Sequence, residues 1–188
     1  MVVEQARRRF TVEEYERMGA AGILGEDDRV ELLDGEIVEM TPIGPRHAGC
    51  VNRLTRLLVA SLGDRAVVAV QNPAHLSLRS MPQPDLVVAR PRDDFYQLAH
   101  PTPADVLLLV EVAETSASFD RRVKTPLYAR AGIPEVWLVD VTSRRVVVHR
   151  APGEGRYADV RTVRPGDRLA PQAFPDFVLT VADVLGDP

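Results

Sequence analysis

The spacing of apolar residues predicts one long amphipathic helix in the first half of the chain. Apolar side chains recur every three or four positions over residues 46–62, at Val51, Leu54, Leu57, Leu58 and Leu62. This spacing places them on a single helical face, which we expect to pack on the core. His47 falls in the first turn of the predicted helix.

After residue 65 the pattern changes from helical to strand-like. Short runs rich in valine and leucine, separated by proline and polar residues, are typical of strands. We expect strands at AVVAV (66–70), HLSLR (75–79), DLVVA (85–89), DVLLLVEVA (105–113) and PEVWLVDV (134–141), and further strands at 145–149 and around Tyr157. The run DVLLLVEVA is almost wholly apolar, as expected of a strand covered on both faces.

Shorter signals complete the predicted order of elements. Thr11 and Glu14 form a capping-box pattern that begins a helix ending near Met18, and Asp34-Gly35 predicts a hairpin turn. A second amphipathic helix is expected over 118–131, and a short turn over 181–185 closes the chain. We therefore predict one α/β domain over residues 1–188, with helices packed on a mixed sheet and an N-terminal helix and β-hairpin.

Composition excludes several classes of protein. The chain has 188 residues, of which 45% are hydrophobic, so it can bury a sizeable core. No apolar run reaches the roughly 18 residues that a membrane span needs. The first ten residues contain Glu4 and an arginine run, where a secretory signal needs an apolar segment. The single cysteine, Cys50, cannot form an internal disulfide. We therefore expect a cytoplasmic protein.

The charged residues are unusual because almost all of the basic ones are arginine. The net charge of −4 argues against a protein that coats nucleic acid by net charge, although a local basic patch remains possible. Of the 23 basic residues, 22 are arginine and one, Lys124, is lysine. The two types serve equally well at most solvated positions but differ where a compact amine is required. Lys124 is therefore a candidate functional residue.

Two carboxylates lie on predicted strands. Asp85 follows Pro84 at the head of DLVVA, where it could ligate a metal or simply begin a strand. Glu111 lies inside DVLLLVEVA, where an ionised side chain costs several kcal/mol unless a cation or hydrogen-bond donors compensate it. A structural salt bridge to an arginine is the alternative role for Glu111, and would leave no cleft beside it.

Lys124 follows these acids in the next predicted helix. Asp120 lies four residues earlier, so an exposed helical ion pair is the alternative to a functional role. Together, Asp85, Glu111 and Lys124 form a more specific pattern than any one of them. Two carboxylates with water suit Mg²⁺ or Mn²⁺, and an amine can orient water or stabilise charge on a phosphate. The pattern favours metal-assisted phosphodiester hydrolysis.

The order of these motifs is similar to that of a known family. VELLDGEIVEM, the helix start at His47, PQPDLVV, LLVEVAETSASFD with Lys124, and YARAGIPEVWLVD up to Asp140 resemble the Uma-type restriction endonucleases of the PD-(D/E)XK nuclease superfamily. The resemblance implies a restriction-endonuclease-like core, a Mg²⁺-dependent site and a nucleic-acid substrate, with DNA expected. Asp85 and Glu111 would be the metal-binding acids.

The chain departs from the superfamily pattern in two places. Ala113 stands where the lysine is usually found, so Lys124 would be its migrated equivalent. The helix predicted at 46–62 has no acid, and Glu31 or His47 are the available substitutes. Each could instead be structural, Glu31 as a solvated strand residue and His47 as a helix-end hydrogen-bonding group. Tyr128 and Trp137 are expected in the core.

The sequence leaves the partners partly open. Arg46, Arg53, Arg121, Arg122 and Arg130 could form a basic rim for phosphates. A non-cleaving nucleic-acid-binding or interaction module on the same fold is the rival to a nuclease, supported by the displaced lysine and the missing helix acid. A homodimer would let paired sites cut both strands of a duplex.

Overall fold

A six-stranded mixed sheet forms the centre of the computed structural model, which describes residues 7–25 and 27–186. Glu4, used above to argue against a secretory signal, lies outside the described residues. The strand order is β3-β4-β5-β6-β7-β8. Their bounds are β3 Val67–Val70, β4 Leu86–Ala89, β5 Val106–Ala113, β6 Glu135–Asp140, β7 Arg145–Pro152 and β8 Tyr157–Val163. Only β5 and β6 are parallel neighbours in this sheet.

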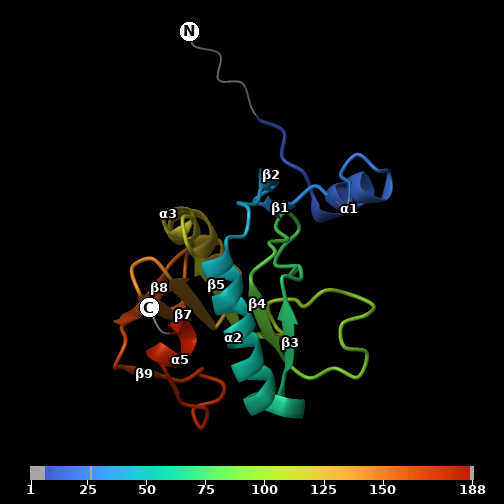
Figure 1. Cartoon of the computed structure of the whole chain (residues 1–188). Coiled ribbons are helices and arrows are strands. Elements are labelled where there is room, and N and C mark those ends of the chain that lie inside the picture. The colour runs from blue at the N-terminus through green and yellow to red at the C-terminus, as the bar shows by residue number, and fades with distance from the viewer. Residues whose placement is uncertain (1–6, 26, 187–188) are drawn as a thin grey trace.

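Helices cover both faces of this sheet (Figure 1). On one face α2 (Pro45–Leu62) and α5 (Val181–Leu185) pack against Leu108, Val110 and Val112. On the other, Leu109 packs with residues of α4 (Thr125–Arg130). Because strand side chains alternate between faces, Glu111 points to the same side as Leu109, toward α4. No helix of the described ranges is long and apolar enough to cross a membrane.

The N-terminal elements lie at one end of the sheet (Figure 1). Helix α1 (Val12–Ala20) begins at Thr11 with the predicted capping box. Strands β1 (Val30–Leu33) and β2 (Glu36–Glu39) form the predicted hairpin, with positive φ at both Asp34 and Gly35, as a two-residue type I′ turn requires. The remaining elements are short: η1 (Gly63–Arg65), and a two-stranded sheet of β9 (Arg168–Leu169) and β10 (Leu179–Thr180).

The helix predicted over 118–131 is not one regular α-helix. It consists of α3 (Ala117–Phe119), a π-helical segment η2 (Asp120–Lys124) and α4. Thr125 donates its backbone N–H to the Asp120 carbonyl, one residue further back than in an α-helix. Pro126 follows and has no N–H to offer the carbonyl four residues before it, which disfavours regular α-helical pairing here. Such π segments are frequent at functional sites.

The prediction of a strand at HLSLR (75–79) is wrong. The segment is a tight turn with a single bridge between Ser77 and Ser80, and Leu78 is 68% exposed. The alternation of leucine with polar residues suggested a strand, but Pro73, Pro82 and Pro84 flank it. Proline has no N–H for a ladder, so a continuous strand cannot extend on either side.

Glu135 is the first residue of β6, and its side chain is buried inside the protein. Its side chain is 0% exposed and accepts hydrogen bonds from Trp137 Nε1 at 2.8 Å and from Arg150 Nη2 at 2.7 Å. The backbone N–H of Gln172 donates to its other oxygen. The Glu135 carboxylate therefore connects β6, β7 and the loop that contains Gln172.

Loss of Glu135 should destabilise the fold strongly. Glu135→Ala leaves the Trp137 N–H without its acceptor and Arg150 without its carboxylate partner, and we expect a loss of about 3–5 kcal/mol in the free energy of unfolding. Urea denaturation followed by tryptophan fluorescence measures this loss. The control is Asp176→Ala, which breaks the exposed pair with Arg65 and should change the midpoint little. Equal midpoints for both variants would contradict the structural role given to Glu135.

Candidate active site

Glu111 is held from the α4 side by two residues one helical turn apart. Tyr128 is fully buried and donates its hydroxyl to Oε1 of Glu111. Lys124 Nζ lies 3.2 Å from the same oxygen. No hydrogen bond from the described residues reaches the second oxygen, Oε2. Tyr128 was expected in the core, and the structure shows it both buried and bonded to a site residue.

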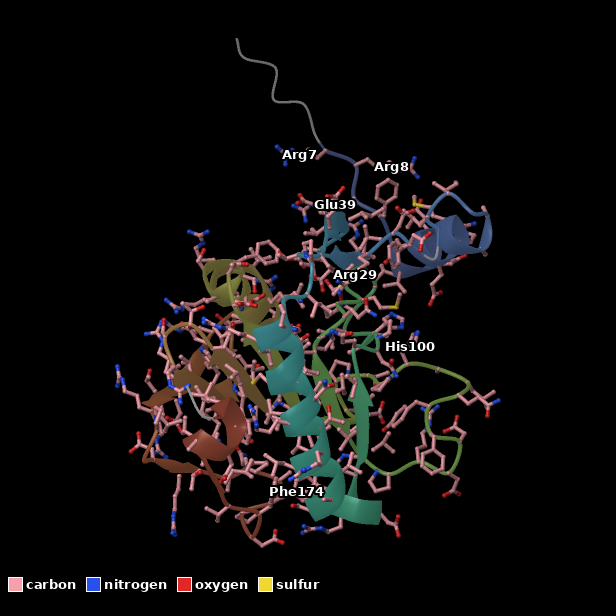
Figure 2. The ribbon with its side chains drawn as sticks, in the orientation of Figure 1. Arg7, Arg8, Arg29, Glu39, His100 and Phe174 are labelled. Carbon is pink, nitrogen blue, oxygen red and sulfur yellow. The ribbon has the colours of Figure 1, made fainter. Side chains whose placement is uncertain are left out.

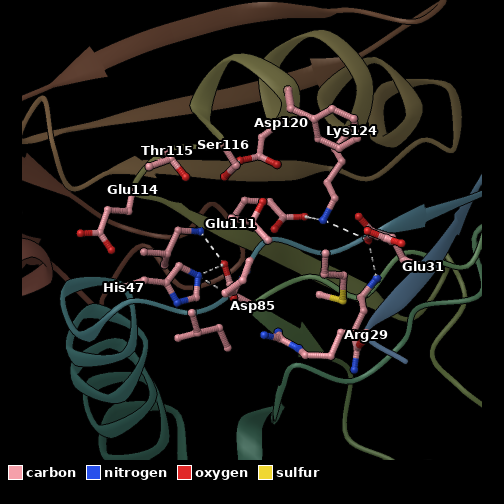
Figure 3. A pocket seen from close by; sticks show the side chains of 18 of the residues that line it. Arg29, Glu31, His47, Asp85, Glu111, Glu114, Thr115, Ser116, Asp120 and Lys124 are labelled. Atoms are coloured by element: carbon pink, nitrogen blue, oxygen red, sulfur yellow. Dashed lines mark hydrogen bonds and ion pairs between the residues drawn. The ribbon is translucent and has the colours of Figure 1, made fainter. Parts of the chain in front are cut away.

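Glu31 reaches the same lysine from the hairpin. Its Oε2 lies 3.0 Å from Lys124 Nζ and also accepts the backbone N–H of Gln83 at 3.0 Å. Lys124 therefore lies between two carboxylates that come from β1 and β5, as Figure 3 shows. The alternative of a solvated Glu31 on an exposed strand is wrong, because Glu31 is only 3% exposed.

Asp85 precedes β4 and is fixed by three donors. The Val112 backbone N–H donates to its Oδ2 at 2.8 Å, and Gln71 Nε2 donates to Oδ1. His47 Nε2, from the first turn of α2, lies 3.0 Å from the carboxylate. This hydrogen bond raises the pKa of His47 above its ordinary value, although partial burial opposes the shift. The start of β4 and the start of α2 thus meet at the Asp85 carboxylate.

Two further acids belong to the site and were not predicted as site residues. Asp120 is buried at the start of the π-helical segment and accepts the hydroxyl of Ser116 at 2.7 Å. The sequence signal for it was its spacing of four residues from Lys124, interpreted as an exposed pair. Glu114 lies against Gly44, where an added Cβ would meet its Oε2 at 2.5 Å. The helix N-terminus of α2 favours a carboxylate there, and only glycine leaves room for it.

All five predicted site residues line one cavity of about 680 Å³ (Figure 3). Asp120 and Glu114 line it as well. The exposed fractions of the innermost side chains are small: Glu31 3%, Asp85 8%, Glu111 5%, Asp120 5% and Lys124 5%. The arginines predicted to form a basic rim do not line this cavity, and Arg130 is paired with Asp34. Arg29, which the sequence analysis did not single out, does line it.

Negative charge exceeds positive charge at the base of the cavity. Four buried carboxyl groups face one lysine and one histidine. Burial raises the pKa of Glu111 to about 8, against the opposing effect of Lys124, and it also raises the pKa of Asp120. Burial alone would lower the pKa of Lys124, but Glu111 and Glu31 outweigh it and raise that pKa. Lys124 therefore stays charged, and burial favours the protonated form of Glu111 over its ionised form.

Both structural alternatives for Glu111 and Lys124 differ from what is observed. The cation beside Glu111 is Lys124 and not an arginine, and a cavity lies next to it. Lys124 is buried rather than in an exposed pair with Asp120. The side chains from β1, β4, β5 and the β5–β6 connection converge on this point.

The donor set fits a hard, partly hydrated cation. Within residues 7–25 and 27–186, no group of three or more His, Cys, Asp or Glu side chains is arranged to hold a metal. Mg²⁺ is usually bound by one or two carboxylates and keeps several waters, so Asp85 and Glu111 meet its needs. The unengaged Oε2 of Glu111 and the excess of buried carboxylates fit a cation of this kind.

Comparisons with known proteins identify a similar fold and a matching family. No curated protein matches the sequence. A crystal structure described as "a putative nuclease belonging to DUF820 from Anabaena variabilis ATCC 29413" is similar in fold, with a TM-score of 0.74 and 14% sequence identity. The match covers 94% of this chain and 97% of that chain. The predicted mixed α/β fold with a restriction-endonuclease-like core is thereby confirmed.

The family is shown by the sequence itself. The model of the Uma2 family, described as "Putative restriction endonuclease", matches residues 12–182, which is most of the chain. This span includes the five residues that meet in the cavity. The family description points to a nuclease, and so to a nucleic-acid substrate. The chain belongs to the Uma2 family of restriction-endonuclease-type proteins.

Proposed function

We propose that the protein is a Mg²⁺-dependent nuclease that hydrolyses phosphodiester bonds in DNA. The observation that carries this proposal is the cluster of buried carboxylates around Lys124 at the base of a cavity. A purely structural cluster of this charge would be costly, because the buried acids outnumber the cationic side chains that face them. A bound divalent cation would compensate the charge.

Asp85 and Glu111 would hold the ion. Asp85 is oriented by Val112 N–H and His47, and Glu111 by Tyr128 and Lys124, so neither carboxylate has to be ordered when the ion binds. Pre-ordered ligands of this kind favour a precise site. The ion would supply Lewis-acid polarisation of the scissile phosphate and a bound water of lowered pKa.

Lys124 would act on the reacting groups directly. Its ammonium makes two contacts, to Glu31 and Glu111, and has a third N–H that can donate to the attacking water or to a phosphate oxygen. In the reaction the water oxygen forms a bond to phosphorus and the bond to the leaving oxygen breaks. The water gives up a proton to solvent, and the leaving oxygen takes one from solvent. Glu31 positions Lys124, and His47 positions Asp85.

The rival function is a non-cleaving nucleic-acid-binding module. Its support was the displaced lysine and the lack of an acid in the first core helix. In the structure Lys124 reaches Glu111 from the next helix, and Glu31 adds an acid from the hairpin. The observed contacts therefore favour the nuclease.

Lys124 and Glu111 should be essential for cleavage. Lys124→Met removes the charge and Lys124→Arg keeps it but loses the compact amine, and we expect each to lower kcat by roughly 100-fold or more. Glu111→Ala should do the same. Cleavage of a labelled DNA in Mg²⁺ or Mn²⁺ measures this. The matched control is Arg122→Ala, an exposed residue of the same segment. Full activity in both the Lys124 and the Glu111 variants would refute the assignment.

Metal binding should release a proton. Because burial raises the pKa of Glu111 to about 8, this side chain is mostly protonated at pH 7 and must ionise to hold a cation. The apparent Kd for Mn²⁺ should tighten by about tenfold per pH unit as pH rises toward 8, and then level off. Calorimetry in two buffers of different ionisation enthalpy measures the proton count. Glu111→Gln should bind Mn²⁺ more weakly and without this release, and a wild-type protein that releases no proton would contradict the expected ionisation.

A further inference from the structure

The reactive groups lie at the base of a recess rather than on an open surface. None of Asp85, Glu111 and Lys124 is more than 8% exposed. The recess is walled by the loop after β2, which includes Met40 and Ile43, and by the start of the β5–β6 connection. Its volume of about 680 Å³ is that of sites that enclose one small molecule. A nucleotide is of this size, and a base-paired duplex is not.

The scissile phosphate has to enter this recess. Mg²⁺ binds oxygen at about 2.1 Å, so an ion shared by a carboxylate and a phosphate keeps their oxygens within roughly 4 Å of each other. The phosphate must therefore come almost into contact with Asp85 and Glu111. In a duplex, that phosphate brings its base pair and the complementary strand with it. In a single strand the neighbouring nucleotides can bend away.

The walls offer contacts suited to an unpaired base. Val38, Met40 and Ile43 contribute apolar surface from the hairpin side, and Phe119 contributes an aromatic ring from α3. Ile43 is 39% exposed although it is apolar. Stacking of bases on such side chains is a general basis for single-strand binding without sequence preference.

The charges around the cavity favour binding of a single DNA strand over binding of a duplex. Arg29 is exposed and lines the cavity, where it can contact one phosphate. Figure 2 labels Arg29 together with Glu39 on the hairpin, and Glu39 and Glu114 also line the cavity. Binding along a duplex depends on many phosphate contacts to basic side chains. This mouth provides a single arginine flanked by acids.

We propose that the cavity takes one nucleotide of an unpaired DNA strand, so that the protein cleaves single-stranded DNA in preference to duplex. The base lies against Ile43 and Phe119, the adjacent phosphate contacts Arg29, and the scissile phosphate reaches Asp85 and Glu111. This substrate class rests on the nuclease function proposed above.

A competition between strand states tests the substrate class. One end-labelled DNA strand is incubated with the full chain and Mn²⁺ in three forms: alone, annealed to its complement, and annealed to a strand that leaves a central unpaired bubble. We expect the single strand and the bubble to be cut at least about 10-fold faster than the full duplex, because a paired base must first leave its stack.

Each outcome has a distinct meaning. Duplex cut as fast as the single strand overturns the inference and leaves the nuclease intact. If no form is cut although Mn²⁺ binds, the proposed nuclease function itself fails. If the same sequence as single-stranded RNA is cut faster than the DNA, the assignment to DNA is overturned.

Two wall variants test the path of the strand. Ile43→Ala and Phe119→Ala should each raise KM for single-stranded DNA several-fold with a smaller change in kcat, because they remove stacking surface and leave Asp85 and Glu111 in place. The control is Phe95→Ala, a 77% exposed aromatic that does not line the cavity. Thermal melting checks that each variant is folded. An unchanged KM in the folded Ile43→Ala protein would contradict the proposed path.

Discussion

The site depends on the contacts that the Lys124 ammonium makes with the carboxyl groups of Glu31 and Glu111. One buried ammonium holds together a strand of the central sheet, the N-terminal hairpin and the connection between the two parallel strands. Lys124 alone does not balance the surrounding carboxylates, since Asp85 and Asp120 are also buried. A protein that builds such a cluster without a cation accepts a large electrostatic penalty. We therefore interpret the cluster as a site prepared for one.

The fold explains how residues distant in sequence arrive at this point. The β5–β6 pair is parallel, so its connection must cross over one face of the sheet, and this places Lys124 and Tyr128 above Glu111. The antiparallel neighbour β4 brings Asp85 beside β5. The β1–β2 hairpin lies at one end of the central sheet and adds Glu31. Each acid thus comes from a different element, and none can be displaced without moving a strand or helix.

Much of the fold and the site could be predicted from local patterns. Runs rich in valine and leucine located the core strands, although HLSLR (75–79) was wrongly predicted as one, and the capping box and Asp34-Gly35 located α1 and the hairpin. Glu111 was identified because a carboxylate in an apolar strand needs a partner. The π-helical segment could not be predicted, because it depends on the pairing around Pro126 rather than on apolar spacing. Asp120 and Glu114 were missed because tertiary packing brings them to the cavity, and a charged residue on a helix or loop is usually solvated.

A crystal soaked with Mn²⁺ tests most directly whether Asp85 and Glu111 share a divalent cation. We expect an anomalous density peak between these two carboxylates, with the remaining ligands supplied by water and Lys124 still bound to Glu31. A cavity without such a peak at saturating Mn²⁺, or a peak at other residues, would refute a shared cation at this site.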